Sequence, residues 1–122
     1  MAQFQNVPGA SQAAFDALNN NMTKQRITPT AGTNVTITSH CCYTVSNMAC
    51  INVSFTMTAD AGSTEYLITG LPTPPVEVPV IAVRNLVSGG SQAVITTNGA
   101  LKNSWDSFLN GKTYFVNCCY AI

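Results

Sequence analysis

Cysteine is the residue type with the greatest chemical potential in this sequence. The five cysteines are Cys41, Cys42, Cys50, Cys118 and Cys119. Neighbouring residues of a strand point to opposite faces of a sheet, so each adjacent pair would place one thiol on either side. A zinc site needs four converging ligands, typically with C-x-x-C spacing, which adjacent strand cysteines do not supply. We therefore predict free thiols and no metal, with a cross-strand disulfide as the open alternative.

Nucleophilic catalysis would require a base beside one of these thiols, or beside a serine or threonine. The only histidine is His40, which directly precedes Cys41. Because adjacent strand residues face apart, these two make a poor dyad, although His40 could meet Cys50 or Cys119 across strands. No acid nearby in the sequence would orient the imidazole. We favour a surface or interface position for His40.

The acidic residues are too few and too scattered for acid–base or calcium chemistry. They are Asp16, Asp60, Glu65, Glu77 and Asp106. A glycosidase places two carboxylates across the scissile bond, and no two of these acids suggest such convergence. A calcium loop needs several acids within a short segment, and a phosphate site needs a glycine-rich loop before a helix. We therefore predict no catalytic residue, no cofactor and no enzymatic activity.

Aromatic side chains offer the best candidate for ligand binding. Trp105 and Phe108 follow a predicted turn, and Tyr66 lies in a short predicted strand over residues 65–69. Exposed aromatic rings on loops can stack on sugar rings. These three residues are therefore our candidate ligand platform. The alternative, which we favour for Trp105, is that its ring plugs one end of the fold.

The elements that would position these residues are strands. From Thr33 onward the hydrophobic period is two, which predicts a long half-buried strand and, after residues 46–48, a second strand paired with it as an antiparallel hairpin. Strict alternation places Cys41 on the same face of the first strand as Val35 and places Cys42 on the opposite face. The first face comprises Val35, Ile37, Ser39, Cys41, Tyr43 and Val45.

Shorter strands follow at regular intervals. Four prolines between Pro72 and Pro79 predict an extended connection or an edge rather than a central strand. Asn98-Gly99 predicts a tight hairpin turn, and residues 112–122 alternate as a last strand. About seven short strands separated by turns predict an all-β fold, an antiparallel β-sandwich or jelly roll with a short N-terminal helix or stem.

The N-terminal residues differ from this pattern. Ser11 can cap a short helix with apolar residues Phe15, Leu18 and Met22 at helical spacing. A helix of this length is marginal alone, so it needs a partner. One alternative is that the helix packs on its own domain. The other is that these three residues form an oligomer seam with other copies of the chain. We predict residues 1–30 as an attachment or stem segment and residues 31–122 as the head domain.

Composition limits the partners. Charged residues make up 8% of the chain and the formal net charge is zero. Typical soluble domains are about a quarter charged, so part of this surface is either polar but uncharged or covered by a partner. Without a basic field, nucleic acid is not expected as a partner. Apolar runs too short for a bilayer predict no membrane insertion, and the N-terminus lacks the pattern of a secretory signal.

The order of features in the C-terminal part is familiar. It consists of a long hairpin, the segment Gly70-Leu71-Pro72, an Asn98-Gly99 turn after an apolar strand and a tyrosine-rich final strand. Over residues 33–122 this order resembles the C-terminal head domains of phage tail fibres and receptor-binding proteins. The resemblance implies a homotrimer of β-sandwiches joined to other virion proteins through an N-terminal stem, with loops presented to the host surface.

The leading functional hypothesis is therefore a non-enzymatic virion structural protein, made in the host bacterial cytoplasm. It would be fibre-like or a capsid decoration protein, and would contribute to host attachment by multivalent binding of surface carbohydrate. The alternative is a free carbohydrate-binding module or lectin-like domain, for which a monomer or dimer is expected. Oligomeric state distinguishes the two hypotheses.

Overall fold

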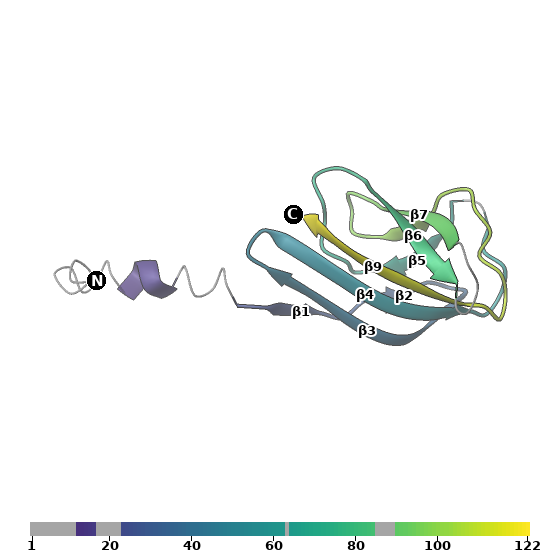
Figure 1. Ribbon diagram of the computed structural model, residues 1–122, viewed down its shortest axis with the longest axis horizontal. Helices are drawn as coiled ribbons and strands as arrows, with labels where there is room; N and C mark the ends of the chain where they lie inside the picture. Colours follow the sequence, from purple (N-terminus) through teal and green to yellow (C-terminus); the bar gives the residue numbers. More distant parts are fainter. Residues whose placement is uncertain (1–11, 17–22, 63, 85–89) are drawn as a thin grey trace.

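The computed structural model describes residues 12–16, 23–62, 64–84 and 90–122. Residues 12–16 are helical, and the remainder forms strands joined by turns (Figure 1). The strands are β1 (Gln25–Ile27), β2 (Thr30–Ala31), β3 (Val35–Val45), β4 (Met48–Met57), β5 (Tyr66–Thr69), β6 (Val78–Arg84), β7 (Gly90–Ile95), β8 (Leu101–Asn103) and β9 (Thr113–Ala121).

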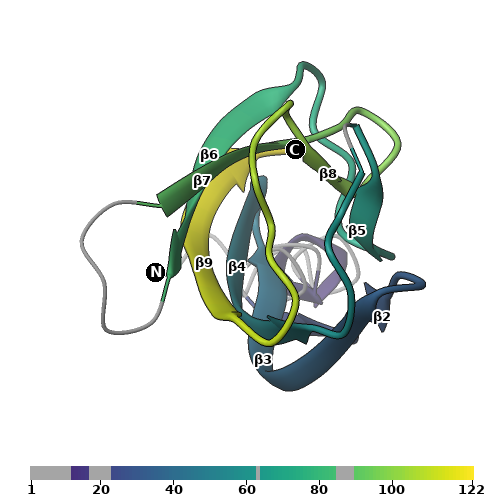
Figure 2. The same ribbon diagram turned by 90° about the vertical axis from the view of Figure 1, so that its right-hand side faces the viewer.

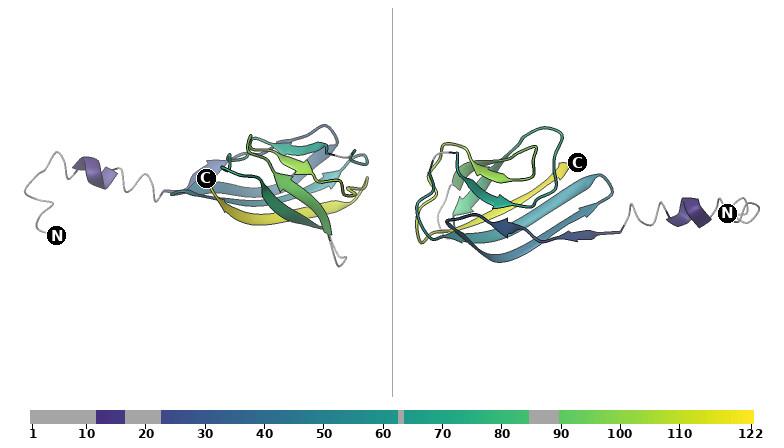
Figure 3. Two further views of the ribbon diagram at one scale, coloured as in Figure 1. Left: turned by 90° about the horizontal axis from the view of Figure 1, so that it is seen from above. Right: turned by 180° about the vertical axis from the view of Figure 1, so that it is seen from behind.

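The described strands form one antiparallel sheet in the order β1-β3-β4-β9-β6-β7-β8-β5-β2. The sheet curls into a half-barrel around its buried face, as the end-on view shows (Figure 2). The predicted all-β antiparallel class is confirmed. A single continuous sheet, rather than two separate ones, supplies both walls of the core. Both views in Figure 3 show the long β3–β4 hairpin and β9 running side by side along one wall.

One short segment connects the two edges of this sheet. β1 pairs with β3 at one edge, and β2 pairs with β5 at the other. Only Thr28 and Pro29 separate β1 from β2. The segment 25–31 therefore changes partners at a proline, which cannot donate a ladder hydrogen bond. β1 and the first residue of β2 lie in the segment predicted as stem, residues 1–30, so the sheet begins within that segment, at Gln25.

The β3–β4 hairpin is present as predicted, but its faces differ from simple alternation. The register shifts by one residue between Ile37 and Ser39, which marks a β-bulge. An extra residue in one strand exchanges the faces of every residue beyond it. Cys42 is therefore buried beside Ile51, while Cys41 is exposed. The prediction that Cys41 shares a face with Val35 was wrong for this reason.

The core lies on the concave face of the sheet. Three aromatic rings pack at its centre, with centroid separations of 6.3 Å for Phe55 and Phe108, 5.8 Å for Phe55 and Tyr114, and 4.8 Å for Phe108 and Tyr114. Aliphatic side chains from β4, β5, β7 and β8 surround them. In the described part of the chain, every buried side-chain nitrogen and oxygen has a hydrogen-bond partner.

The prediction that the proline-rich stretch avoids a central strand was wrong at Pro79, since β6 lies between β9 and β7 in the sheet. Pro79 lies within β6, but β6 pairs with β9 only at Val83 and Arg84, so the missing amide hydrogen of Pro79 costs no bond on that side. Gly99 lies in the turn between β7 and β8 with φ of 81°. The prediction of a tight two-residue turn was wrong, because Ile95 pairs with Leu101 and residues 96–100 form the connection.

The predicted N-terminal helix is present over residues 12–16. Phe15 on it is 64% exposed. Leu18 and Met22, the other two residues of the predicted oligomer seam, lie outside the described residues. Within the ranges that the structure describes, no helix is long and apolar enough to cross a bilayer.

Candidate functional site

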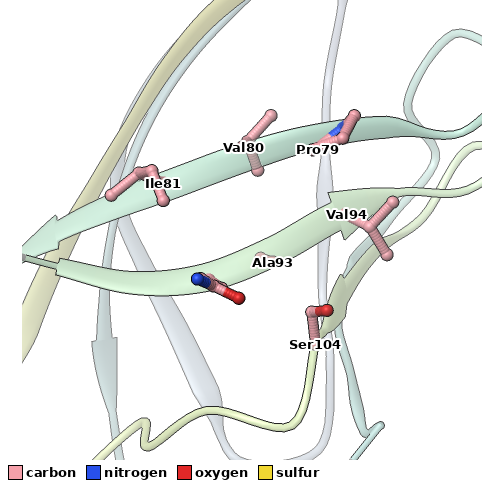
Figure 4. Close-up of a pocket in the computed structure, with 7 residues that line it drawn as sticks. Pro79, Val80, Ile81, Ala93, Val94 and Ser104 are labelled. Carbon is pink, nitrogen blue, oxygen red and sulfur yellow. The ribbon is translucent and has the colours of Figure 1, made fainter.

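The convex face of β6 and β7 carries an open hollow of about 390 Å³, which we call the outer hollow. Figure 4 shows Pro79, Val80 and Ile81 along one strand, Ala93 and Val94 along its neighbour, and Ser104 at the margin. Gln92 completes the lining. Ile81 pairs with Gln92 and Pro79 with Val94, so the floor is apolar except for the Gln92 side chain. Mostly apolar hollows with a few polar groups are the usual form of ligand sites.

The two aromatics of the following loop have opposite environments. Trp105 directly follows Ser104 and is 78% exposed, whereas Phe108 is buried in the aromatic cluster of the core. The prediction of Phe108 as part of a ligand platform was therefore wrong. The prediction that Trp105 plugs one end of the fold was also wrong, because Phe108 fills the core. The placement of Trp105 in the ligand platform stays open.

The loop that carries Trp105, residues 103–107, is held by a buried amide, and we call it the Trp105 loop. The Asn103 side-chain nitrogen donates to the Gly62 and Asp106 carbonyl oxygens, both at 2.9 Å. Its side-chain oxygen accepts from the Asp106 amide, also at 2.9 Å. Trp105, between these anchors, has φ of 59°. A non-glycine residue seldom adopts this left-handed conformation, and such residues concentrate at functional sites.

The Trp105 loop is also joined to the wall of the outer hollow. The Gln92 amide donates to one carboxylate oxygen of Asp106 at 2.8 Å, and the Ser104 amide donates to the Gln92 carbonyl at 3.2 Å. The other Asp106 oxygen accepts from the Ser107 amide at 2.8 Å. Hydrogen bonds from the Gln92 and Ser107 amides lower the Asp106 pKa. The loop and β7 therefore form one rigid unit.

Tyr66 lies on the same convex face. It pairs with Lys102, which pairs with Val94 of the outer hollow. The Lys102 ammonium lies 5.8 Å from the centre of the Tyr66 ring, and Tyr66 is 46% exposed. A row of side chains thus runs from Tyr66 across Lys102 and Val94 to Pro79. Tyr66 and the Trp105 loop border one continuous face of β6, β7 and β8, which carries our candidate site.

The cysteines lie on both faces of the other wall. Cys42 and Cys118 flank Ile51 on the concave side, and Cys50 pairs with Cys119 on the convex side. Burial, followed by the charges of neighbouring thiols, raises the Cys118 pKa to about 11. Burial likewise raises the Cys42 pKa. Both thiols are therefore protonated at neutral pH and act as small apolar side chains.

His40 pairs with Val53, so it lies on the opposite face from Cys50 and Cys119. The structure does not bring this imidazole to either thiol. Across the residues that the structure describes, no three histidine, cysteine or acidic side chains are arranged to hold a metal ion.

In the comparisons with known proteins, no family model, no curated protein and no solved structure matches the chain.

Four residues that build the candidate site, Gln92, Asn103, Ser104 and Asp106, did not emerge from the sequence. Asn103 and Asp106 share the spacing of a side-chain-capped turn, which is a signal in principle. The sequence predicts Ile81 and Val94 only as strand residues and Pro79 only as part of a connection or edge, because the curvature that hollows the convex face depends on the whole sheet.

Proposed function

We propose that the protein is a non-enzymatic virion structural protein that contributes to host attachment by binding carbohydrate on the convex face of β6, β7 and β8. The supporting observation is Trp105, a highly exposed indole held in a left-handed conformation next to the outer hollow. Exposing a large aromatic ring in this way gains nothing for folding. A sugar ring stacked on it would cover its apolar face.

The charge of the chain favours an uncharged ligand. It carries five basic and five acidic residues, so no strong field attracts an ion. The hollow instead offers the Gln92 side-chain amide and the Ser104 hydroxyl next to apolar Ile81 and Val94. Sugars present hydroxyl groups around an apolar ring face and fit such a mixed surface. Because this hollow is open, each contact is weak, and several copies held together would supply the affinity.

The single tryptophan allows a direct test of glycan binding. We would probe a printed array of bacterial surface polysaccharides and neutral oligosaccharides, then titrate the best array ligand while recording tryptophan emission. A ligand stacked on Trp105 should shift and quench this emission. Trp105→Ala should weaken binding, measured by calorimetry, at least about tenfold, or about 1.4 kcal/mol. Trp105→Phe, which keeps a ring, should lose less.

Met48→Ala is the matched control. Met48 is also an exposed apolar residue, but it pairs with Ala121 at the far end of the sheet. Its removal should leave binding unchanged. If the array gives no ligand, or if Trp105→Ala binds as tightly as the parent protein, carbohydrate binding at this face is wrong.

Assembly into a virion is tested by solution mass. We propose a homotrimer with a seam at Phe15, Leu18 and Met22, supported by the exposed ring of Phe15 and by the low charge of the chain. Light scattering should give a trimer for the full chain and a smaller species for a chain starting at Thr23, which keeps β1 intact. A monomer in both cases would overturn the trimer and favour a free carbohydrate-binding module.

A further inference from the structure

The convex face of β4 and β9 holds two thiols directly opposite each other. Cys50 and Cys119 are register partners in the antiparallel β4–β9 ladder. Opposite residues in such a ladder have Cα atoms about 4.5 to 5.5 Å apart, and a disulfide requires about 4.4 to 6.8 Å. We propose that Cys50 and Cys119 form a cross-strand disulfide when the protein meets a low-molecular-weight disulfide such as oxidised glutathione.

The other thiol pairs are not positioned for this bond. Cys42 and Cys118 lie on either side of Ile51, two strand spacings or roughly 9.6 Å apart, beyond the reach of a disulfide. Cys41 pairs with Asn52, so it is only diagonal to Cys50, and diagonal neighbours lie about 7 to 8 Å apart. The register thus selects one pair among five cysteines.

The surroundings of the pair are consistent with this chemistry. Cys119 is exposed and Cys50 is partly exposed, so a small disulfide can reach them. The pKa of Tyr43, the β3 register partner of Cys50, is raised, mainly by its interaction with the Cys50 thiol. The hydrogen bond from Cys50 is the main cause that raises the Cys119 pKa above 9.0. Oxidation is therefore slow at neutral pH and faster in alkali, as the thiolate fraction increases.

The reaction proceeds by two exchanges. The Cys119 thiol loses a proton, and its thiolate attacks one sulfur of oxidised glutathione, forming a mixed disulfide and releasing one glutathione thiolate. The Cys50 thiolate, having lost its own proton, then attacks the Cys119 sulfur and displaces the second glutathione thiolate. Both glutathione thiolates take up the two protons. The protein is oxidised by two electrons, and one oxidised glutathione becomes two reduced molecules.

The bond would join two strands that are already neighbours, so it leaves the folded sheet unchanged. It would instead restrict the unfolded chain by closing the long loop between residues 50 and 119. A protein made with reduced thiols would thereby gain stability after leaving the reducing cytosol. This inference does not depend on carbohydrate binding.

The test uses the full chain. Purified reduced protein is incubated with oxidised glutathione at pH 8.5, the remaining thiols are blocked, and the intact mass and proteolytic peptides are analysed without reductant. We expect an intact mass equal to that of the reduced protein minus about 2 Da plus three blocking groups, and one cross-linked peptide pair containing Cys50 and Cys119. The midpoint temperature of unfolding should rise by roughly 10 °C, and a reductant should reverse the rise.

Three single variants make the assignment specific. Cys41→Ser and Cys118→Ser, which remove the vicinal partner of another cysteine, should still form the bond. Cys50→Ser should stop at a glutathione adduct on Cys119, and circular dichroism checks that this variant is folded. A different cross-linked pair, stable glutathione adducts on the parent protein, or no reaction at pH 8.5 would each overturn the proposal.

Discussion

Asn103 and Asp106 form two hydrogen bonds with each other, each 2.9 Å long, on either side of Trp105. The first joins the Asn103 side-chain nitrogen to the Asp106 carbonyl, and the second joins the Asp106 amide to the Asn103 side-chain oxygen. Asn103 is completely buried. The position of the exposed indole is therefore determined by an amide inside the fold.

Removal of that amide should destabilise the whole domain. In Asn103→Ala, the Gly62 and Asp106 carbonyls and the Asp106 amide would lose a buried partner, and a cavity would replace the Asn103 amide. We expect a loss of about 3 kcal/mol in the free energy of unfolding, measured by urea denaturation. Asn52→Ala, on the exposed face of β4, is the control and should change stability by less than about 0.5 kcal/mol. Equal effects of both substitutions would contradict the role of Asn103.

Two glycines with similar backbone angles should respond differently to alanine. Gly99 and Gly111 have φ of 81° and 77°. A Cβ atom on Gly99 would lie 2.2 Å from the Leu71 carbonyl oxygen, whereas one on Gly111 meets nothing within 4 Å. Gly111→Ala should cost about 1 kcal/mol for its backbone conformation alone, and Gly99→Ala about 3 kcal/mol or more. Thermal unfolding of both variants measures the difference, which would be absent if the close approach were irrelevant.

The Trp105 loop should resist acid. The Asp106 pKa is lowered from 3.8 by hydrogen bonds from the Gln92 and Ser107 amides. A carboxylate with a lowered pKa stabilises the fold above its unfolded pKa, and this stabilisation is lost as pH falls through the folded pKa. Tryptophan emission should therefore stay constant from neutral pH to below pH 3.8. At lower pH, protonation of Asp106 should change the emission, and this change should disappear in Asp106→Asn. If the change persisted in this variant, a group other than Asp106 would be responsible for it.

The thiols should differ widely in reactivity. With its pKa raised to about 11 by burial, Cys118 is ionised to only about one part in a thousand at pH 8. Exposed Cys41 should therefore be alkylated by iodoacetamide long before Cys118, as peptide mass spectrometry over time would show. In urea all five cysteines should react at similar rates. Equal rates for Cys41 and Cys118 in the folded protein would refute the burial argument.

The comparison of sequence and structure shows where local pattern is sufficient. The strands at 35–45 and 48–57 follow from period-two alternation, because each buries one face of a sheet. The bulge near Thr38 could not be predicted, since nothing in the local sequence marks the extra residue. Because strict alternation does not include this bulge, the sequence-based prediction assigned Cys41 and Cys42 to the wrong faces of the sheet.

The two loop aromatics show a second limit. Trp105 and Phe108 are equally plausible as exposed rings by spacing alone, and their assignment depends on which reaches Phe55 and Tyr114. Which ring makes these contacts depends on where the sheet places Phe55 of β4, which is far away in the sequence, beside Tyr114 of β9. The buried contacts of Asn103 likewise join it to Gly62, so the anchor of the candidate site was not visible in its own segment.

The segment 25–31, which pairs with both edges of the sheet, also determines how the fold would respond to mechanical force. A pull on the chain before Thr23 acts along β1, whose three residue pairs with β3 run antiparallel to it. Force along a strand loads its hydrogen bonds together rather than one after another. Beyond Pro29 the same load reaches β2 and the opposite edge, so tension from the N-terminal side is shared by both walls of the half-barrel.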